Sequence, residues 1–105
     1  MISFTVCGSP QTDAVRVFAQ DSTTQAEDVG SATVKNDAGT IPLISMVSVD
    51  SAYQKRGIGL KALEEAVNRY PAGQEFRYVA ATAGGAALIA ALRRNVPAIK
   101  LTEID

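Results

Sequence analysis

The sequence predicts a single α/β (α+β) domain with a mixed, mostly antiparallel sheet and two helices after the central strand. Three observations carry this prediction. The chain has 105 residues, which is the size of one ordinary domain. Its first half alternates apolar and polar residues with the period of two that β-strands show. Its second half alternates strand-like segments with stretches of helical period, an order typical of an α/β fold with a mixed sheet.

Alternation predicts the strands of the first half. In residues 2–7 apolar side chains alternate with polar or small ones, and a Gly-Ser-Pro sequence ends the run. Residues 15–20 alternate in the same way and indicate a second strand, with a short helix as the alternative. Residues 29–35 mix Val and Thr with small residues. Residues 36–39 are Asn-Asp-Ala-Gly, which suits the turn of a hairpin.

Apolar residues occupy both faces of the strand expected at residues 41–49. Ile44 and Met46 lie on one face. The residues of the other face are Ile41, Leu43, Val47 and Val49. A strand that is apolar on both faces is typically buried on both sides, so we expect residues 41–49 to be the central strand.

The period changes after this strand. We predict an amphipathic helix over residues 57–70, which Pro71 stops. The apolar residues that mark its buried face are Leu60, Leu63, Val67 and Tyr70. Residues 76–82 have the length and composition of a strand, and residues 85–94 form an Ala and Leu run of high helix propensity. Alternation resumes at residues 99–104, which indicates a last strand.

Composition excludes several classes of function. With 10 basic and 11 acidic residues, the net charge of −1 provides no basic face for nucleic acid. No apolar stretch approaches the ~20 residues that span a bilayer, and no export signal opens the chain, so we expect a cytoplasmic protein. Histidine is absent, which excludes His-dependent nucleophiles and most zinc sites. The single cysteine, Cys7, has no basic neighbour in sequence, and we expect a buried, inert thiol.

The junction between the central strand and the next helix carries the strongest signal for binding. Gly57 and Gly59 lie where the helix begins, so no side chain keeps an anion away from the backbone N–H groups of its first turn. Lys55, Arg56 and Lys61 add positive charge on both sides of the glycines. Glycines at such a turn also occur for conformational reasons alone, but the basic flank favours a phosphate site. The loop lacks both the Walker Gly-Lys-Ser/Thr and the third glycine of a dinucleotide-binding fingerprint.

Residues 49–63 resemble motif A of the GCN5-related N-acetyltransferases, V-x-P-x-[Y/F]-[Q/R]-x-x-G-[I/V]-G-x-x-L. The matching residues are Val49, Tyr53, Gln54, Gly57, Ile58, Gly59 and Leu63. Ser51 stands where proline is commoner. The resemblance extends over roughly residues 29–97 and implies an acyl-coenzyme A N-acyltransferase fold with acetyl-coenzyme A as the cofactor.

The same resemblance assigns cofactor-binding residues. The backbone of Val47, Ser48 and Val49 would bind the pantetheine arm. The residues that would hold the pyrophosphate are Gln54, Lys55, Arg56, Gly57, Ile58, Gly59, Leu60 and Lys61. The implied function is transfer of an acetyl group to a primary amine, whether of a small molecule, a peptide or a protein, by direct attack in a ternary complex.

Two departures from the family bear on this function. Residues 8–13 are too few for the two helices that the family carries between its first two strands. The acceptor side should therefore be open, or completed by a partner. Ala91 stands where the family has the tyrosine that protonates the leaving thiolate. The alternative function is therefore an acyl-coenzyme A-binding or protein-interaction module with weak catalysis or none.

Few other residues are candidates for catalysis or assembly. Asp50, at the end of the central strand, is either a base that relays a proton from the amine through water or a cap of the following turn. Tyr53, Tyr70 and Tyr78 are either packing residues or the acid that replaces the missing tyrosine. The small size, the missing helices and the apolar surface of residues 86–92 predict a homodimer.

Overall fold

The strands and helices follow one another in the order that the sequence predicts. The computed structural model describes residues 2–23, 28–36, 41–53, 56–79 and 83–104. The strands of the first half are β1 (Ile2–Gly8), β2 (Ala14–Asp21), β3 (Gly30–Lys35) and β4 (Leu43–Val49). The elements of the second half are the 3-10 helix η1 (Ser51–Tyr53), α1 (Ile58–Val67), β5 (Glu75–Tyr78), α2 (Ala83–Asn95) and β6 (Lys100–Glu103).

Two elements end earlier than expected. α1 ends at Val67, and the N–H groups of Arg69 and Tyr70 bond to carbonyls three residues back, at 3.2 and 3.1 Å. The chain tightens there because Pro71 disfavours α-helical geometry in the residue before it. β5 ends at Tyr78, and residues 80–82 of the expected strand lie outside the described residues.

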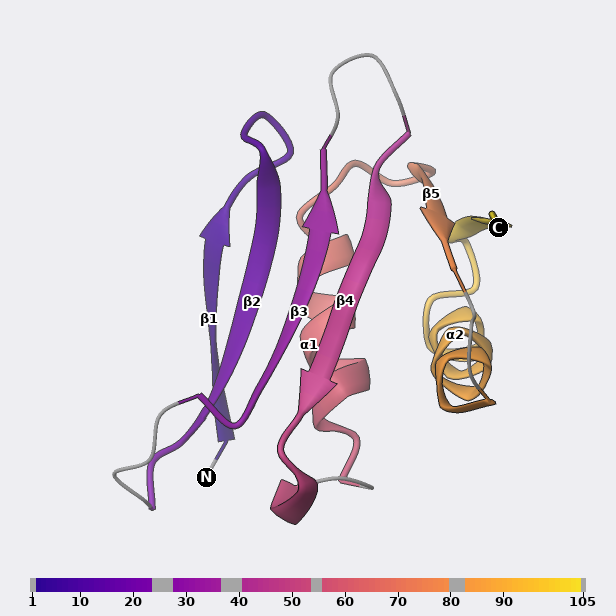
Figure 1. The fold of residues 1–105 in the computed structure, drawn as a ribbon. Coiled ribbons are helices and arrows are strands. Elements are labelled where there is room, and N and C mark those ends of the chain that lie inside the picture. The colour runs from indigo at the N-terminus through magenta and orange to yellow at the C-terminus, as the bar shows by residue number, and fades with distance from the viewer. Residues whose placement is uncertain (1, 24–27, 37–40, 54–55, 80–82, 105) are drawn as a thin grey trace.

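One sheet holds the described strands in sequence order, β1-β2-β3-β4-β5-β6 (Figure 1). β1 to β4 pair antiparallel, and β5 pairs parallel with both β4 and β6. The predicted mixed, mostly antiparallel sheet is therefore confirmed. Because parallel crossovers share one hand, α1 and α2 lie on the same face of the sheet. Leu63 of α1 and Leu92 of α2 accordingly belong to one core cluster, and both are completely buried.

Over residues 86–92 the exposed side of α2 is built from small residues. Ile89 and Leu92 turn into the core, while Ala86, Ala87 and Ala90 are exposed. The apolar surface that the sequence predicts for subunit contact therefore consists of alanine methyl groups. Neither α2 nor any other helix in the described ranges is long and apolar enough to cross a membrane.

β4 is central, but it is not buried on both faces, so that part of the prediction is wrong. Ile44 is buried, whereas Met46 is 59% exposed. The pairing with β3 skips Ser45, because Ile44 lies opposite Val34 and Met46 lies opposite Thr33. This β-bulge shifts the alternation by one residue, so Val47 packs against the same core as Ile44.

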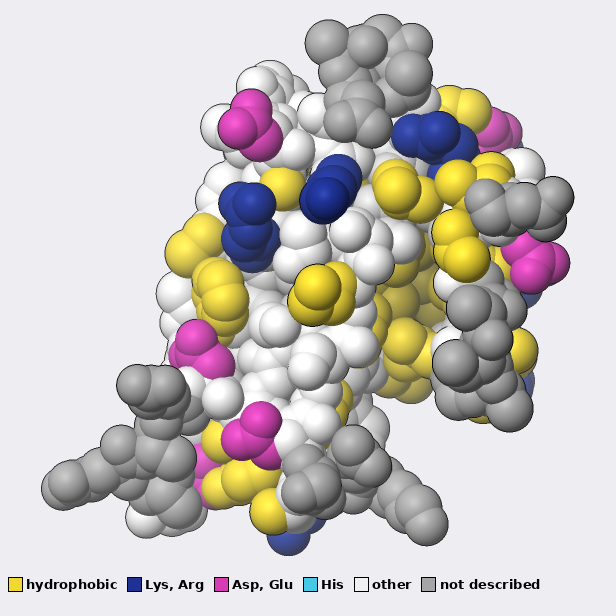
Figure 2. Space-filling model, in the orientation of Figure 1, with side chains coloured by type: hydrophobic (Ala, Val, Ile, Leu, Met, Phe, Trp, Pro, Cys, Tyr) yellow, Lys and Arg dark blue, Asp and Glu magenta, His cyan; other side chains and the backbone are white. Residues whose placement is uncertain are grey.

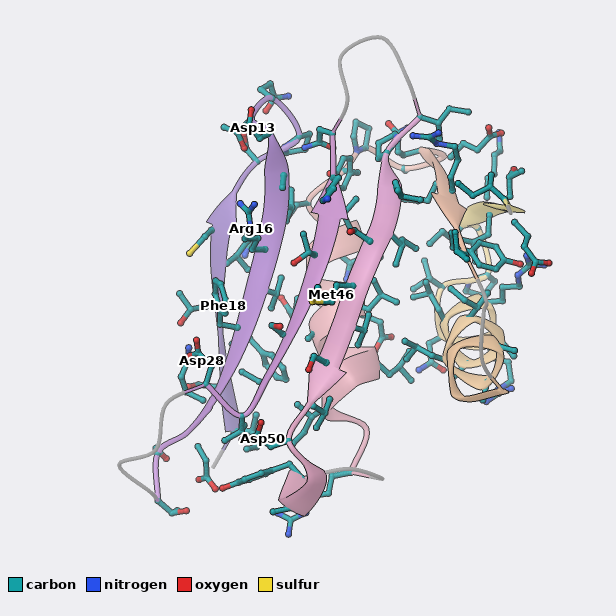
Figure 3. The ribbon with its side chains drawn as sticks, in the orientation of Figure 1. Asp13, Arg16, Phe18, Asp28, Met46 and Asp50 are labelled. Atoms are coloured by element: carbon teal, nitrogen blue, oxygen red, sulfur yellow. The ribbon has the colours of Figure 1, made fainter. Side chains whose placement is uncertain are left out.

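The other face of β1 to β4 carries no helix in the described part of the chain. Arg16, Phe18 and Met46 point out from it toward the viewer in Figure 3. Most side chains there are polar or small, as in the cross-strand row Thr5, Phe18, Ser31 and Ser48. An antiparallel sheet with this alternation can face water on one side. Cys7 of β1 lies opposite Arg16 of β2. Cys7 is exposed, so the expectation of a buried thiol is wrong.

Candidate functional site

β4 and β5 pair at one end and separate at the other. The residues of β4 that pair with β5 are Leu43 and Ile44, opposite Arg77 and Tyr78. In Figure 1 the two strands lie together near the start of β4, and α2 lies to the side of the second half of β4. No described strand therefore pairs with this edge of β4 beyond Ile44.

Backbone hydrogen bonds show which polar groups of β4 face this opening. The N–H of Asp50 donates to the carbonyl of Val29 at 2.9 Å, so Asp50 bonds on the β3 side. Ser48 also faces β3, because its carbonyl oxygen lies 3.1 Å from the position of a Cβ built on Gly30. Alternate residues of a strand direct their N–H and C=O groups to opposite edges. Val47 therefore directs both groups toward the opening, where an extended ligand can pair with them.

A cleft lies between β4, the start of α1 and α2, and we call it the β4–α2 cleft. Its first lobe has a volume of about 570 Å³ and its second lobe about 370 Å³. The two lobes meet at Val47 and Leu88, which line both. Figure 2 shows hydrophobic side chains deep in the recess between β4 and α2. The lining of the first lobe comprises Val47, Val49, Tyr53, Gly57, Ile58, Gly59, Leu60, Ala87, Leu88 and Ala91.

α1 begins at the first lobe, and no acidic side chain in its first turn offsets the partial positive charge of its N-terminus. Gly57 is the N-cap and makes no side-chain hydrogen bond, and the first turn holds no acidic residue. Lys61 donates its N–H to the carbonyl of Gly57 at 3.0 Å, which is the first bond of the helix. The N–H groups of residues 58–60 have no acceptor among the described residues. Such groups, together with the helix dipole, bind anions.

Gly57 and Gly59 are required for different reasons. Gly57 has a left-handed φ of +75°, and a Cβ built on it would meet nothing within 4 Å. Its requirement is conformational, because most side chains disfavour this φ. A Cβ on Gly59 would lie 3.1 Å from Cγ1 of Val47 and 3.2 Å from Cγ2 of Val49, so Gly59 is needed for close packing of α1 on β4. Both glycines have a role in the fold, and both line the first lobe.

Most residues predicted to bind the cofactor come together at the first lobe. Those that line it are Val47, Val49, Gly57, Ile58, Gly59 and Leu60. Ile58 is buried and packs with Ala19 and Val29, so its side chain anchors α1. Ser48, Arg56 and Lys61 line neither lobe, and Ser48 lies in a row of the sheet face on which no helix packs in the described part of the chain. Gln54 and Lys55 lie outside the described residues.

Arg56 is held beside the start of α1. It is exposed, and its guanidinium carbon lies 5.2 Å from the centre of the Tyr53 ring, within cation–π range. Tyr53 in turn donates its hydroxyl to Oδ2 of Asp21 at 2.7 Å. Hydrogen bonds from Thr23, and then from Tyr53, hold the pKa of the Asp21 carboxyl well below its usual range.

Asp50 lies away from the cleft. It follows β4 (Figure 3), is exposed and lines neither lobe. Its carbonyl accepts the N–H of Tyr53 at 2.8 Å, which closes the turn into η1. This bond uses the backbone of Asp50, so both roles that the sequence allows for its side chain stay predictions.

The three tyrosines occupy three different environments. Tyr53 lines the first lobe, with its hydroxyl bonded to Asp21. Tyr70 packs edge-on against Phe76 at a separate cavity of about 300 Å³. Tyr78 is buried and lines the second lobe, and its hydroxyl accepts a hydrogen bond from Nη2 of Arg93 at 3.3 Å. A guanidinium only donates, so Tyr78 keeps its own hydroxyl proton to donate.

Sequence reasoning missed two parts of this site. Asp21 lies 32 residues from Tyr53 and belongs to no motif, so no local signal connects them. Ala87 and Leu88 form the α2 wall of the first lobe together with Ala91, which the sequence did single out. The spacing of Ala87 and Ala91 places them on one helix face, and this spacing was the available signal.

Comparisons of the chain with protein-family models and with curated proteins find no match.

Proposed function

We propose that the protein has an acyl-coenzyme A N-acyltransferase fold, binds acetyl-coenzyme A in the β4–α2 cleft and transfers the acetyl group to a primary amine by direct attack. The observation that carries the proposal is the order of groups along one cleft. The N–H groups of residues 58–60, without an acceptor in the described part of the chain, lie at the first lobe. The edge of β4 at Val47 joins the lobes, and Tyr78 lines the second. This order suits a ligand with phosphates at one end, an extended amide chain and a reactive group at the other.

The residues present fit such a ligand. The space around Gly57 is open to an anion, since a Cβ there would meet no atom within 4 Å. Arg56 adds a positive charge one residue before it. The lobe volumes, about 570 and 370 Å³, are in the range of small-molecule sites, ~300–1,000 Å³. The resemblance of residues 49–63 to motif A supports the same ligand.

Each part of the cleft would contribute a separate effect. Bound acetyl-coenzyme A would supply an activated acetyl thioester. The N–H groups of residues 58–60 would hold the phosphates, and the N–H and C=O of Val47 would orient the pantetheine arm. Leu88 would exclude water from the junction of the lobes. Tyr78 would give a proton to the leaving sulfur, the task for which Ala91 has no polar group.

The acceptor would approach from an open side. β1 and β2 are joined by the turn of residues 9–13, in which Thr12 bonds back to Ser9, so no helix covers this part of the sheet. Met46 and Val79, which line the second lobe, are 59% and 51% exposed. We therefore propose that the amine reaches the second lobe from solvent.

A non-catalytic acyl-coenzyme A-binding module is the second candidate. Ala91 favours it, because the methyl group on the wall of the first lobe cannot act as an acid. The two candidates share the ligand and differ in turnover alone.

Calorimetry and a turnover assay test both candidates. We expect coenzyme A to bind, pantetheine without the phosphates to bind much more weakly, and added salt to weaken the binding of coenzyme A. Thiol release from acetyl-coenzyme A with a panel of amines and peptides, with mass spectrometry for self-acetylation, then separates the enzyme from the binding module. Absence of coenzyme A binding, or equal binding of pantetheine, would contradict the proposal.

A further inference from the structure

A chain of three side chains connects β2 to the start of α1. Asp21, the last residue of β2, accepts the N–H and the hydroxyl of Thr23 on Oδ1, at 3.0 and 2.7 Å. Its Oδ2 accepts the hydroxyl of Tyr53 at 2.7 Å. The guanidinium of Arg56 lies over the ring of Tyr53 in a cation–π contact, with its carbon 5.2 Å from the ring centre.

Tyr53 is held at both ends. Its ring packs with the cluster of Ala19, Val29 and Ile58 and lines the first lobe, while its hydroxyl is bound by Asp21. Thr23 fixes the carboxylate in turn through two hydrogen bonds. The position of the Tyr53 ring, and with it the position of Arg56, therefore depends on Asp21, which belongs to β2.

We propose that Asp21 is a positioning residue for the coenzyme phosphates: through Tyr53 it holds Arg56 beside the N-terminus of α1. This inference rests on the proposed function. A free arginine side chain loses rotamer freedom when it binds a phosphate, and an arginine that already lies on an aromatic ring loses less. Asp21 thus prepares the site without touching the ligand.

Two effects of Asp21 on phosphate binding have opposite signs. Its negative charge repels an anion, and because the carboxylate is half-buried, salt screens this repulsion only in part. Its hydrogen bond to Tyr53 orders Arg56, and ordering a flexible side chain in advance strengthens binding roughly 3- to 10-fold. We therefore expect removal of this carboxylate to weaken coenzyme A binding, whereas loss of its negative charge alone would strengthen it.

The test compares three variants by calorimetry with coenzyme A and with pantetheine. Tyr53→Phe removes only the hydroxyl that Asp21 binds, and Asp21→Ala removes the acceptor. Asp28→Ala is the matched control, because Asp28 is an exposed carboxylate beside the end of β2 whose side chain accepts Nε2 of Gln20, at 2.8 Å, instead of Tyr53. We expect about 3- to 10-fold weaker coenzyme A binding for the first two variants, unchanged pantetheine binding, and unchanged or tighter coenzyme A binding for Asp28→Ala.

A double variant shows whether the effect passes through Arg56. In an Arg56→Ala background, Tyr53→Phe should weaken binding no further, because no guanidinium remains to be positioned. Circular dichroism checks that each variant folds, and Tyr53→Phe keeps the test decisive if Asp21→Ala does not fold. Wild-type protein that binds no coenzyme A overturns this inference and the proposed function together. Wild-type binding with folded Tyr53→Phe of equal affinity, or with an equal loss for pantetheine, overturns the positioning role alone.

Discussion

Gly59 lies directly against Val47, so closely that a Cβ on the glycine would stand 3.1 Å from Cγ1 of the valine. This contact brings the first turn of α1 down onto β4 at the point where β4 has lost its pairing with β5. The helix N-terminus and the open strand edge therefore lie side by side in the first lobe. The shape of the candidate site therefore depends on residue 59 being glycine.

We expect Gly59→Leu to destabilise the fold. The larger side chain would enter the space of Val47 and Val49, and such overpacking typically lowers the free energy of unfolding by about 1–3 kcal/mol. Lys61→Leu, which adds the same side chain at an exposed position of α1, should change it by less than about 0.5 kcal/mol. Urea unfolding measures both. Val47→Ala should relieve part of the loss, and a loss unaffected by Val47→Ala would contradict this packing role.

Gly57→Asp should weaken coenzyme A binding at least about tenfold relative to Gly57→Asn. Asn and Asp both tolerate the left-handed φ of +75° at this position, so the backbone strain is matched. Only the aspartate places a negative charge where the phosphates would bind. Calorimetry on the two folded variants isolates the charge. Equal affinities would mean that the N-terminus of α1 does not hold an anion.

Ala91→Tyr should raise the rate of acetyl transfer and leave coenzyme A affinity nearly unchanged. Residue 91 lines the first lobe three residues after Leu88, which lines both lobes, and helical side chains lean toward the preceding turn, so a phenol ring there would extend toward the junction of the lobes and the thioester beyond it. A positioned general acid typically contributes ~10²–10⁴-fold. Ala91→Phe adds the ring without the hydroxyl and is the control. An equal effect of Tyr and Phe on the rate of thiol release would show that position 91 does not deliver a proton.

Tyr78→Phe should lower the same rate about tenfold or more without affecting coenzyme A affinity. Tyr78 lines the second lobe, and its hydroxyl accepts a hydrogen bond from Nη2 of Arg93 at 3.3 Å, so its own proton remains available to donate. Tyr70→Phe, at a separate cavity, is the matched control. The prediction fails if Tyr78→Phe transfers acetyl groups as fast as Tyr70→Phe and the wild type.

Tyr70 should make the fold sensitive to alkaline pH. Burial raises the pKa of its hydroxyl above the ordinary value of 10.0, while the hydrogen bond to Oδ1 of Asn36 acts against this. Above pH ~10 the unfolded chain loses this proton first, so the contribution of Tyr70 to stability is full below pH ~10 and is lost as pH rises through the folded pKa. Unfolding experiments from pH 8 to 11 should show Tyr70→Phe less stable at pH 8, by about 0.5–1.5 kcal/mol, with a difference that shrinks at higher pH. A constant difference would contradict the raised pKa.

The candidate binding loop between β4 and α1 was predictable because its signals are local. A glycine before a helix, basic neighbours and a preceding apolar strand all lie within residues 49–63, and the structure places Gly57, Gly59 and Leu60 in one cleft lobe. The separate reasons for the two glycines were not predictable, because one depends on a φ angle and the other on the side chains of β4. Asp21 was missed for the same reason, since its hydrogen bond to Tyr53 spans 32 residues.

The sequence by itself determined the order and type of the elements, because the periods of two and of 3.6 residues are properties of consecutive side chains. Only the tertiary structure decided which faces of those elements are buried. Residues 41–49 look apolar on both faces, but the bulge at Ser45 turns Ile44 and Val47 to the core and leaves Met46 exposed. A bulge arises from pairing with another strand, and a cleft arises where such pairing stops. The bulge and the cleft both depend on residues far apart in the chain, so no local pattern of side chains predicts them.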